Sequence, residues 1–180
     1  RAPGMSMRRV PFFAMSALVT GLGLVIVMPV LLGTLTYLFV DHRNGREAFG
    51  GNTGLYDWAG WIFSPGAAVL FAIPVAGLLA EGAPLQRTPA RGVVFAGFGL
   101  MGVAALGSVT QQAVHNVPWA GSGLSLGGSE DVREKLFNVV PWAMFNLVPL
   151  LGLTIVLLMS LFLAKPVKGA RPNVTPALAF

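Results

Sequence analysis

The sequence predicts an all-α, polytopic membrane protein with four transmembrane helices. Hydrophobic residues make up 54% of the chain and charged residues only 11%, and the mean hydropathy is +0.71. This composition is far more apolar than that of an ordinary soluble domain. Four apolar runs also reach the roughly 20 residues that a helix needs to cross the hydrocarbon core. Asp, Glu, Lys, Arg and His occur only near the ends of these runs.

The predicted helices cover residues 10–40, 55–80, 92–117 and 136–164 of one membrane domain, residues 1–180. The first is roughly 46 Å long at 1.5 Å per residue. We expect it to tilt, bend or project, and Pro29 supplies a place to bend. Residues 165–180 contain three prolines and three basic residues and are interpreted as a cytoplasmic tail or a linker. Because the chain starts at Arg1, we interpret it as a piece of a longer polypeptide.

Small residues recur at a spacing of four in two of these helices. Ala17 with Gly21, and Ala104 with Ser108, have the small-xxx-small spacing that lets membrane helices approach closely. We therefore predict that both pairs contribute to ordinary packing within the bundle.

Basic residues are distributed unevenly between the two sets of connections. Of the 12 Lys and Arg residues, eight lie in one set, where Glu81 is the only acidic residue. These eight are Arg1, Arg8, Arg9, Arg87, Arg91, Lys165, Lys168 and Arg171. Because cytoplasmic connections are enriched in Lys and Arg, we predict that both termini are cytoplasmic. We also expect the membrane to be a bacterial plasma membrane.

Several classes of protein are excluded by composition and context. The chain has no cysteine, so it has no disulfide, thiolate metal site or cysteine nucleophile. The glycine-rich connections at 41–57 and 118–134 do not follow a strand, so we interpret them as external turns rather than phosphate-binding loops. A pI near 10.5 is compatible with nucleic-acid binding, but the basic residues flank membrane spans. Anionic membrane lipids are therefore the expected partner, and nucleic acid is not.

Three stretches resemble subunit I of the haem–copper oxidases, the cytochrome c oxidase family. They are the opening RAPGMSMRRVPFF, the sequence PVLLGTLTYLFVD at 29–41, and WIFSPGAAV at 61–69. Pro11, Pro29, Thr36 and Asp41 keep the family's spacing, and Pro74 follows the third stretch as a proline does in the family. The resemblance covers the region of helices five to eight of a twelve-helix bundle. It implies a degenerate member or a fragment, with other membrane subunits of a respiratory complex as partners.

The residues that perform the family's chemistry are replaced here. The family's first copper-ligand histidine falls on Pro65, its gating glutamate on Ala67 and its cross-linked tyrosine on Val69. Its second and third copper-ligand histidines fall on Gln111 and Gln112. Its proton-path lysine falls on Phe145. Copper in such a site takes imidazole nitrogen as its ligand, and a proton path through hydrocarbon needs ionisable groups or ordered water. We therefore predict no catalytic residue, no metal site and no cofactor held by this chain itself, although a full-length protein or complex could hold haem.

A few polar residues remain as candidates for binding. We interpret Gln111 and Gln112 first as an interhelical hydrogen-bond clamp, with a quinone, a haem substituent or a degenerate metal contact as alternatives. Asn146 is interpreted in the same way and could be their partner. His115, at the outer end of the third helix, is the remaining cofactor candidate, whereas His42 is expected to be a solvated surface residue.

Other conspicuous side chains have ordinary structural interpretations. The four tryptophans, Trp58, Trp61, Trp119 and Trp142, are predicted to lie in an aromatic belt at the outer interface. Ser64 has no base near it in the sequence, so we do not interpret it as a nucleophile.

Two functional hypotheses remain open. In the first, the chain keeps the family's helix framework without the oxygen chemistry, and serves as a structural or accessory subunit of a respiratory electron-transfer complex. In the second, it is part of an oxidase-related redox core that binds haem through helices or subunits outside this chain, with cytochrome c or quinol oxidase as the family's activity. A small-solute or ion transporter is disfavoured because no charged residue marks a path.

Overall fold

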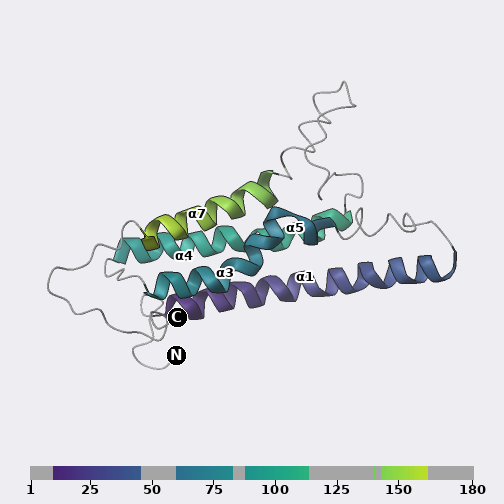
Figure 1. Ribbon diagram of the computed structural model, residues 1–180, viewed down its shortest axis with the longest axis horizontal. Helices are drawn as coiled ribbons and strands as arrows, with labels where there is room; N and C mark the ends of the chain where they lie inside the picture. The colour runs from purple at the N-terminus through teal and green to yellow at the C-terminus, as the bar shows by residue number, and fades with distance from the viewer. Residues whose placement is uncertain (1–9, 46–59, 83–87, 114–139, 141–142, 162–180) are drawn as a thin grey trace, which may run out of the picture.

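The computed structural model describes residues 10–45, 60–82, 88–113, 140 and 143–161. The helices α1 (Phe12–Arg43), α3 (Pro65–Gly82), α4 (Thr88–Gly102), α5 (Ala104–Ala113) and α7 (Val148–Leu161) form one elongated bundle (Figure 1). A 3-10 turn, η2 (Gly60–Phe63), leads into α3, and a π-helical turn, η3 (Ala143–Leu147), leads into α7. The part of the chain that the structure describes contains no strand.

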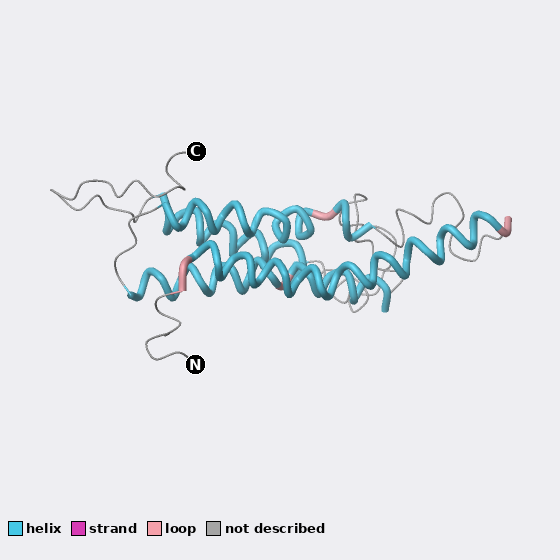
Figure 2. Tube along the Cα trace, turned by 90° about the horizontal axis from the view of Figure 1, so that it is seen from below, coloured by secondary structure: helices cyan, strands magenta, loops and turns pink. Residues whose placement is uncertain are grey.

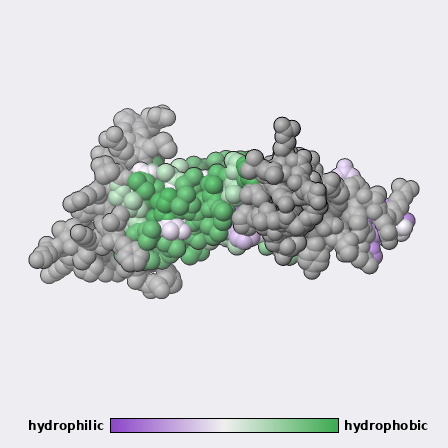
Figure 3. Space-filling view, turned by 90° about the horizontal axis from the view of Figure 1, so that it is seen from above, coloured by the Kyte–Doolittle hydropathy of each residue, from purple (hydrophilic) through white to green (hydrophobic). Residues whose placement is uncertain are grey.

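Among the residues that the structure describes, four segments are long and apolar enough to cross a membrane. They are Phe12–Arg43, Pro65–Gly82, Ala90–Val109 and Ala143–Leu161. Apolar side chains cover most of the described middle of the bundle on the face shown in Figure 3, and hydrophilic residues mark the far end of α1. The chain is therefore an all-α, polytopic integral membrane protein, and the predicted fold class is confirmed.

The helices pack as a ring. α1 lies along α3, α3 packs against α7, α7 packs against α4, and α4 with α5 returns to α1. The first residue of α1, the last of α3, the first of α4 and the last of α7 lie at the same end of the bundle (Figures 1 and 2). The chain therefore runs up and down alternately, and α1 continues well past its neighbours at the opposite end.

The helix bounds differ from the predicted ones in ways that follow from hydrogen bonding. α1 begins at Phe12 because Pro11 precedes it as the N-cap. The third helix begins at Thr88 rather than at residue 92. Pro89 suits a first helical turn, and this polar turn is invisible to a search for apolar residues. Pro29 lies inside the continuous helix α1.

The third predicted helix is interrupted between α4 and α5. At this point Val103 N–H donates to Leu100 O at 3.3 Å, and Leu106 N–H donates to Val103 O at 3.0 Å. Both bonds span three residues instead of four, so the helix tightens locally. The sequence predicts one uninterrupted helix here, because no proline marks the interruption.

One of the two small-residue predictions was wrong. Gly21 has no neighbouring atom within 4 Å of an added Cβ, and Ala17 is exposed. The contact face of α1 instead contains Ser16, whose side chain occupies the space beside Gly77 of α3. The second pair is buried as predicted, with Ala104 at 0% and Ser108 at 2% exposure.

Candidate functional site

The start of α3 carries the most closely packed polar cluster in the described bundle. Ser64 precedes the helix, and its Oγ accepts a hydrogen bond from Ala67 N–H at 3.2 Å. This is the ordinary N-cap arrangement, in which a hydroxyl satisfies an amide that the helix cannot bond internally. Ser64 is therefore a capping residue, consistent with the prediction that it is not a nucleophile.

A second amide at this helix start is satisfied from another segment of the chain. Gly66 N–H donates to Asn146 Oδ1 of η3 at 3.2 Å, and Asn146 is 1% exposed. Because no water is available in the hydrocarbon core, each backbone amide there needs a partner in the protein. Asn146 thus bonds the backbone of α3 from another segment, as predicted for an interhelical clamp.

The third polar contact joins the start of α3 to the interruption between α4 and α5. Trp61 is 2% exposed, and its indole Nε1–H donates to Ala104 O at 2.8 Å. The prediction that Trp61 belongs to an interfacial belt was therefore wrong. A buried indole N–H needs a hydrogen-bond acceptor. For Trp61 the acceptor is the carbonyl of Ala104, which directly follows the locally tightened helix at Val103.

Glycines bring these three segments into backbone contact. A Cβ added at Gly66 would collide with the carbonyl oxygen of Phe145. A Cβ added at Gly107 of α5 would lie 2.7 Å from Nε1 of Trp61 and 3.2 Å from Cβ of Phe145. The space between α3, α5 and η3 is therefore filled by the protein itself. We call this group of residues, Trp61, Ser64, Gly66, Ala104, Gly107, Phe145 and Asn146, the α3 junction.

The positions that the resemblance singles out are distributed around the α3 junction. Ala67 and Val69 are buried, at 0% and 3% exposure, and Phe145 lies in the junction itself. Pro65 is exposed, so the position of the family's first copper ligand does not face the core of the described helices. His42 is exposed near the end of α1, as predicted.

The remaining predicted candidates fall outside what the structure describes. Gln111 and Gln112 lie in the last turn of α5, but only their backbone is described. His115 lies outside the described residues, and so do Trp58, Trp119 and Trp142. Their assignment as clamp, cofactor contact or aromatic belt therefore stays a prediction.

The residues described do not fit a copper ion. Pro65, Ala67 and Val69 carry no donor atom in their side chains, and copper sites of this kind use imidazole. Within the described part of the chain, no group of three or more His, Cys, Asp or Glu side chains lies close enough together to hold a metal ion. The described arrangement can bind helices to one another by hydrogen bonds between side chains and the backbone.

The α3 junction was only partly predictable. Asn146 was visible as a polar residue inside an apolar run. The pattern of Gly66 and Gly107 is ordinary for a membrane helix, and only the packing shows which glycines touch a neighbour. An indole at the start of an apolar run suits a membrane interface and a buried contact equally well, so the position of Trp61 required the structure.

Comparison with known proteins gives matches to subunits of cytochrome c oxidase. The chain is 31% identical over 130 residues to cytochrome c oxidase subunit 1 of Cereibacter sphaeroides, which covers 69% of this chain and 23% of that protein. It is 34% identical over 122 residues to the probable cytochrome c oxidase subunit 1-alpha of Streptomyces coelicolor, covering 64% of this chain and 20% of the relative. The probable subunit 1-beta of Nocardia farcinica is 30% identical over 110 residues, covering 59% of this chain and 19% of the relative.

The chain therefore spans about a fifth of the length of these relatives, from 19% to 23%. No family model matches the chain. No solved structure matches it either.

Proposed function

This chain is a membrane protein similar to one section of haem–copper oxidase subunit I, and from this premise we propose its function. We propose that the chain keeps the helix framework of that section without the oxygen-reducing copper site. In this proposal it acts as a structural or accessory part of a respiratory electron-transfer complex. Other membrane subunits of that complex and membrane lipids are its partners. Cytochrome c or quinol oxidation is the activity of the family and is not assigned to this chain.

One observation carries the proposal. The backbone of Gly66 contacts the carbonyl of Phe145, and Asn146 bonds the same glycine at 3.2 Å. Protein atoms thus occupy the space beside the positions where the resemblance expects a histidine, a glutamate and a tyrosine. Apolar side chains at those positions give a metal no ligand and give a proton no acceptor. This packing supports a scaffold more directly than a reaction centre.

The deciding experiment is an optical redox spectrum of the purified, full-length membrane complex, with copper and haem iron quantified per chain. The proposal expects no stoichiometric copper that depends on this chain and no carbon monoxide-binding haem. Haem that binds carbon monoxide together with stoichiometric copper would overturn it. Low-spin haem without copper would favour the second hypothesis, a redox core in which residues outside this chain hold the haem.

A variant that restores the missing ligands sharpens the test. Pro65→His combined with Gln111→His and Gln112→His returns the three imidazoles to the matched positions. Because Pro65 is exposed and the adjacent backbone is closed against Phe145, we expect the triple variant to bind no stoichiometric copper. Copper recovery to one ion per chain would mean that only the ligands, and not the packing, had been lost.

We also propose that both termini are cytoplasmic in a bacterial plasma membrane. The support is the concentration of Lys and Arg in the connections at the end where α1 begins. Since the chain has no cysteine, single introduced cysteines report topology without background. In intact cells, a membrane-impermeant maleimide should label Arg43→Cys and leave Gly82→Cys unlabelled. The reverse pattern would invert the orientation.

A further inference from the structure

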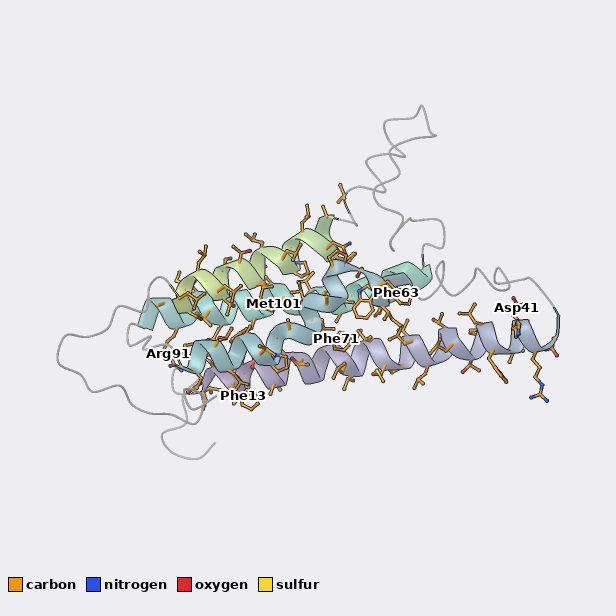
Figure 4. The ribbon with its side chains drawn as sticks, in the orientation of Figure 1. Phe13, Asp41, Phe63, Phe71, Arg91 and Met101 are labelled. Carbon is orange, nitrogen blue, oxygen red and sulfur yellow. The ribbon has the colours of Figure 1, made fainter. Side chains whose placement is uncertain are left out.

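The end of the bundle where α1 begins contains a cation, Arg91, that has no acidic partner among the described residues. Arg91 lies in the first turns of α4 and is partly buried (Figure 4). Its Nη2 donates to the carbonyl oxygen of Val10 at 2.7 Å, which is a neutral acceptor. Its Nε is shielded and donates no hydrogen bond. Within the described part of the chain, no carboxylate forms a salt bridge with it.

The one acidic side chain described at this end is already engaged. Glu81, at the end of α3, accepts hydrogen bonds from the N–H groups of Phe12 and Phe13 at 2.5 and 3.4 Å. It therefore caps the start of α1, where Pro11 offers no side-chain cap, and its negative charge faces the positive end of that helix. The carboxylate of Glu81 is therefore already bonded to the start of α1. An anion other than Glu81 is needed to neutralise the charge of Arg91.

Aromatic rings hold the guanidinium in a fixed place. Its central carbon lies 4.4 Å from the centroid of the Phe12 ring and 5.7 Å from that of Phe95, and the two rings lie 5.4 Å apart. Such stacking orients a guanidinium without consuming its N–H donors. The planar group is therefore pre-positioned, and most of its five donors remain uncommitted to the described residues.

The site lies where phosphate groups occur. The four helix ends that meet here mark one boundary of the apolar part of the bundle, and the connections attached to them carry eight of the 12 basic residues of the chain. A guanidinium binds phosphate oxygens through two parallel hydrogen bonds. Basic residues beside a membrane also attract anionic phospholipids.

We propose that Arg91 is the core of a binding site for the phosphate of an anionic phospholipid. The inference rests on the membrane placement in the proposed function, but not on the absence of copper. A spectrum that contradicts the scaffold hypothesis would therefore leave the lipid site standing, and loss of the lipid site would leave the scaffold hypothesis standing.

The test uses the full-length complex purified in dodecyl maltoside. Retained dioleoylphosphatidylglycerol is counted by native mass spectrometry, and its affinity is measured by titration against dioleoylphosphatidylcholine. Arg91→Gln should weaken phosphatidylglycerol binding about fivefold, the effect expected for one basic residue near an anionic surface. Arg43→Gln is the matched control, because it removes the same charge from an exposed residue at the opposite end of α1. Its affinity should be unchanged.

Further arms separate the alternatives. Equal losses in Arg91→Gln and Arg43→Gln would overturn the proposal, because the effect would then be one of net charge. A stabilising shift with inorganic phosphate equal to that with phosphatidylglycerol would overturn the lipid assignment in favour of a soluble anion. If Arg91→Gln cannot be purified, Arg91→Lys decides. It keeps the charge but loses the planar fork, so reduced phosphatidylglycerol affinity supports the site and unchanged affinity overturns it.

Discussion

The α3 junction and the half of α1 that ends at Arg43 both lie in apolar stretches of the sequence, yet they are built in opposite ways. We call this half of the helix the outer half of α1, because it continues past the neighbouring helices. In the junction, glycine backbones touch neighbouring segments, and the polar contacts of Trp61 and Asn146 cross between segments. In the outer half of α1 the buried side chains include Thr34 and Asp41, at 3% and 4% exposure, whereas Leu32 and Phe39 are 60% and 61% exposed. Two polar side chains are thus buried there, while large apolar side chains are exposed.

The difference shows which forces hold this protein together. In a soluble protein the exposed leucines of α1 would be a defect, but lipid solvates them as well as a protein core does. Burial of apolar area therefore gives little advantage inside the membrane. Close van der Waals packing and satisfied hydrogen bonds distinguish the folded bundle from separated helices. Substitutions in the α3 junction should consequently cost far more than substitutions on the outer face of α1.

The largest effect should come from Gly66→Ala. The added methyl group would collide with the backbone carbonyl of Phe145, which cannot rotate away as a side chain could. We expect a loss of about 3 kcal/mol in the free energy of unfolding, at the upper end for overpacking. Reversible unfolding by sodium dodecyl sulfate in mixed micelles measures it. Gly21→Ala is the matched control, since nothing lies within 4 Å of its added Cβ.

That control should be neutral or slightly stabilising, because alanine is the better helix former by about 1 kcal/mol. Similar behaviour of the two glycine variants would mean that the contact between α3 and η3 contributes nothing to stability.

The next effect should come from Asn146→Leu. This change keeps the approximate volume but removes the acceptor of Gly66 N–H, and an unsatisfied buried amide costs about 2 kcal/mol. Thr154→Val in α7 is the control, because its exposed hydroxyl bonds only to the carbonyl of Leu150 in the same helix. The same micelle titration should show a difference of less than about 0.5 kcal/mol for that control. A stability loss of equal size in both variants would contradict the clamp.

A smaller effect should follow from Trp61→Phe. The variant keeps an aromatic ring but loses the Nε1–H that bonds Ala104 O, a change worth about 1 kcal/mol. Ile62→Val alters the adjacent, exposed residue and should leave stability unchanged. Unchanged stability in Trp61→Phe would show that the indole is held by packing alone.

The sequence predicts the helices well because hydrocarbon imposes a simple requirement, about 20 apolar residues for each crossing. It also predicts Asn146, since a carboxamide inside an apolar run must find a partner. It does not predict the side of a helix that meets a neighbour. Ala17 and Gly21 have the spacing of a contact face, but the contact is made one position away at Ser16 and Thr20. Nearly every side of such a helix is apolar, so periodicity carries little information here.

The candidate site was predictable to a similar extent. That Pro65, Ala67 and Val69 carry neither an imidazole nor an ionisable side chain is legible from the sequence. The close approach of Gly66 to Phe145 depends on two segments separated by about 80 positions along the chain, and only the three-dimensional packing brings them together. The interruption at Val103 likewise lies beside a tertiary contact, since the carbonyl of Ala104 accepts the hydrogen bond of Trp61 from another segment.

The smallest effect should come from the outer half of α1. Leu35 is 44% exposed, and Val27, two turns earlier, is fully buried. In the full-length complex Leu35→Ala should change stability by less than about 0.5 kcal/mol, because lipid or detergent contacts the side chain in both the folded and unfolded states. Val27→Ala should cost about 1 kcal/mol through lost packing contacts. If Leu35→Ala costs as much as Val27→Ala, then protein rather than lipid covers that face of α1 in the complex. The exposed apolar side chains along this half of α1 would then mark a subunit contact.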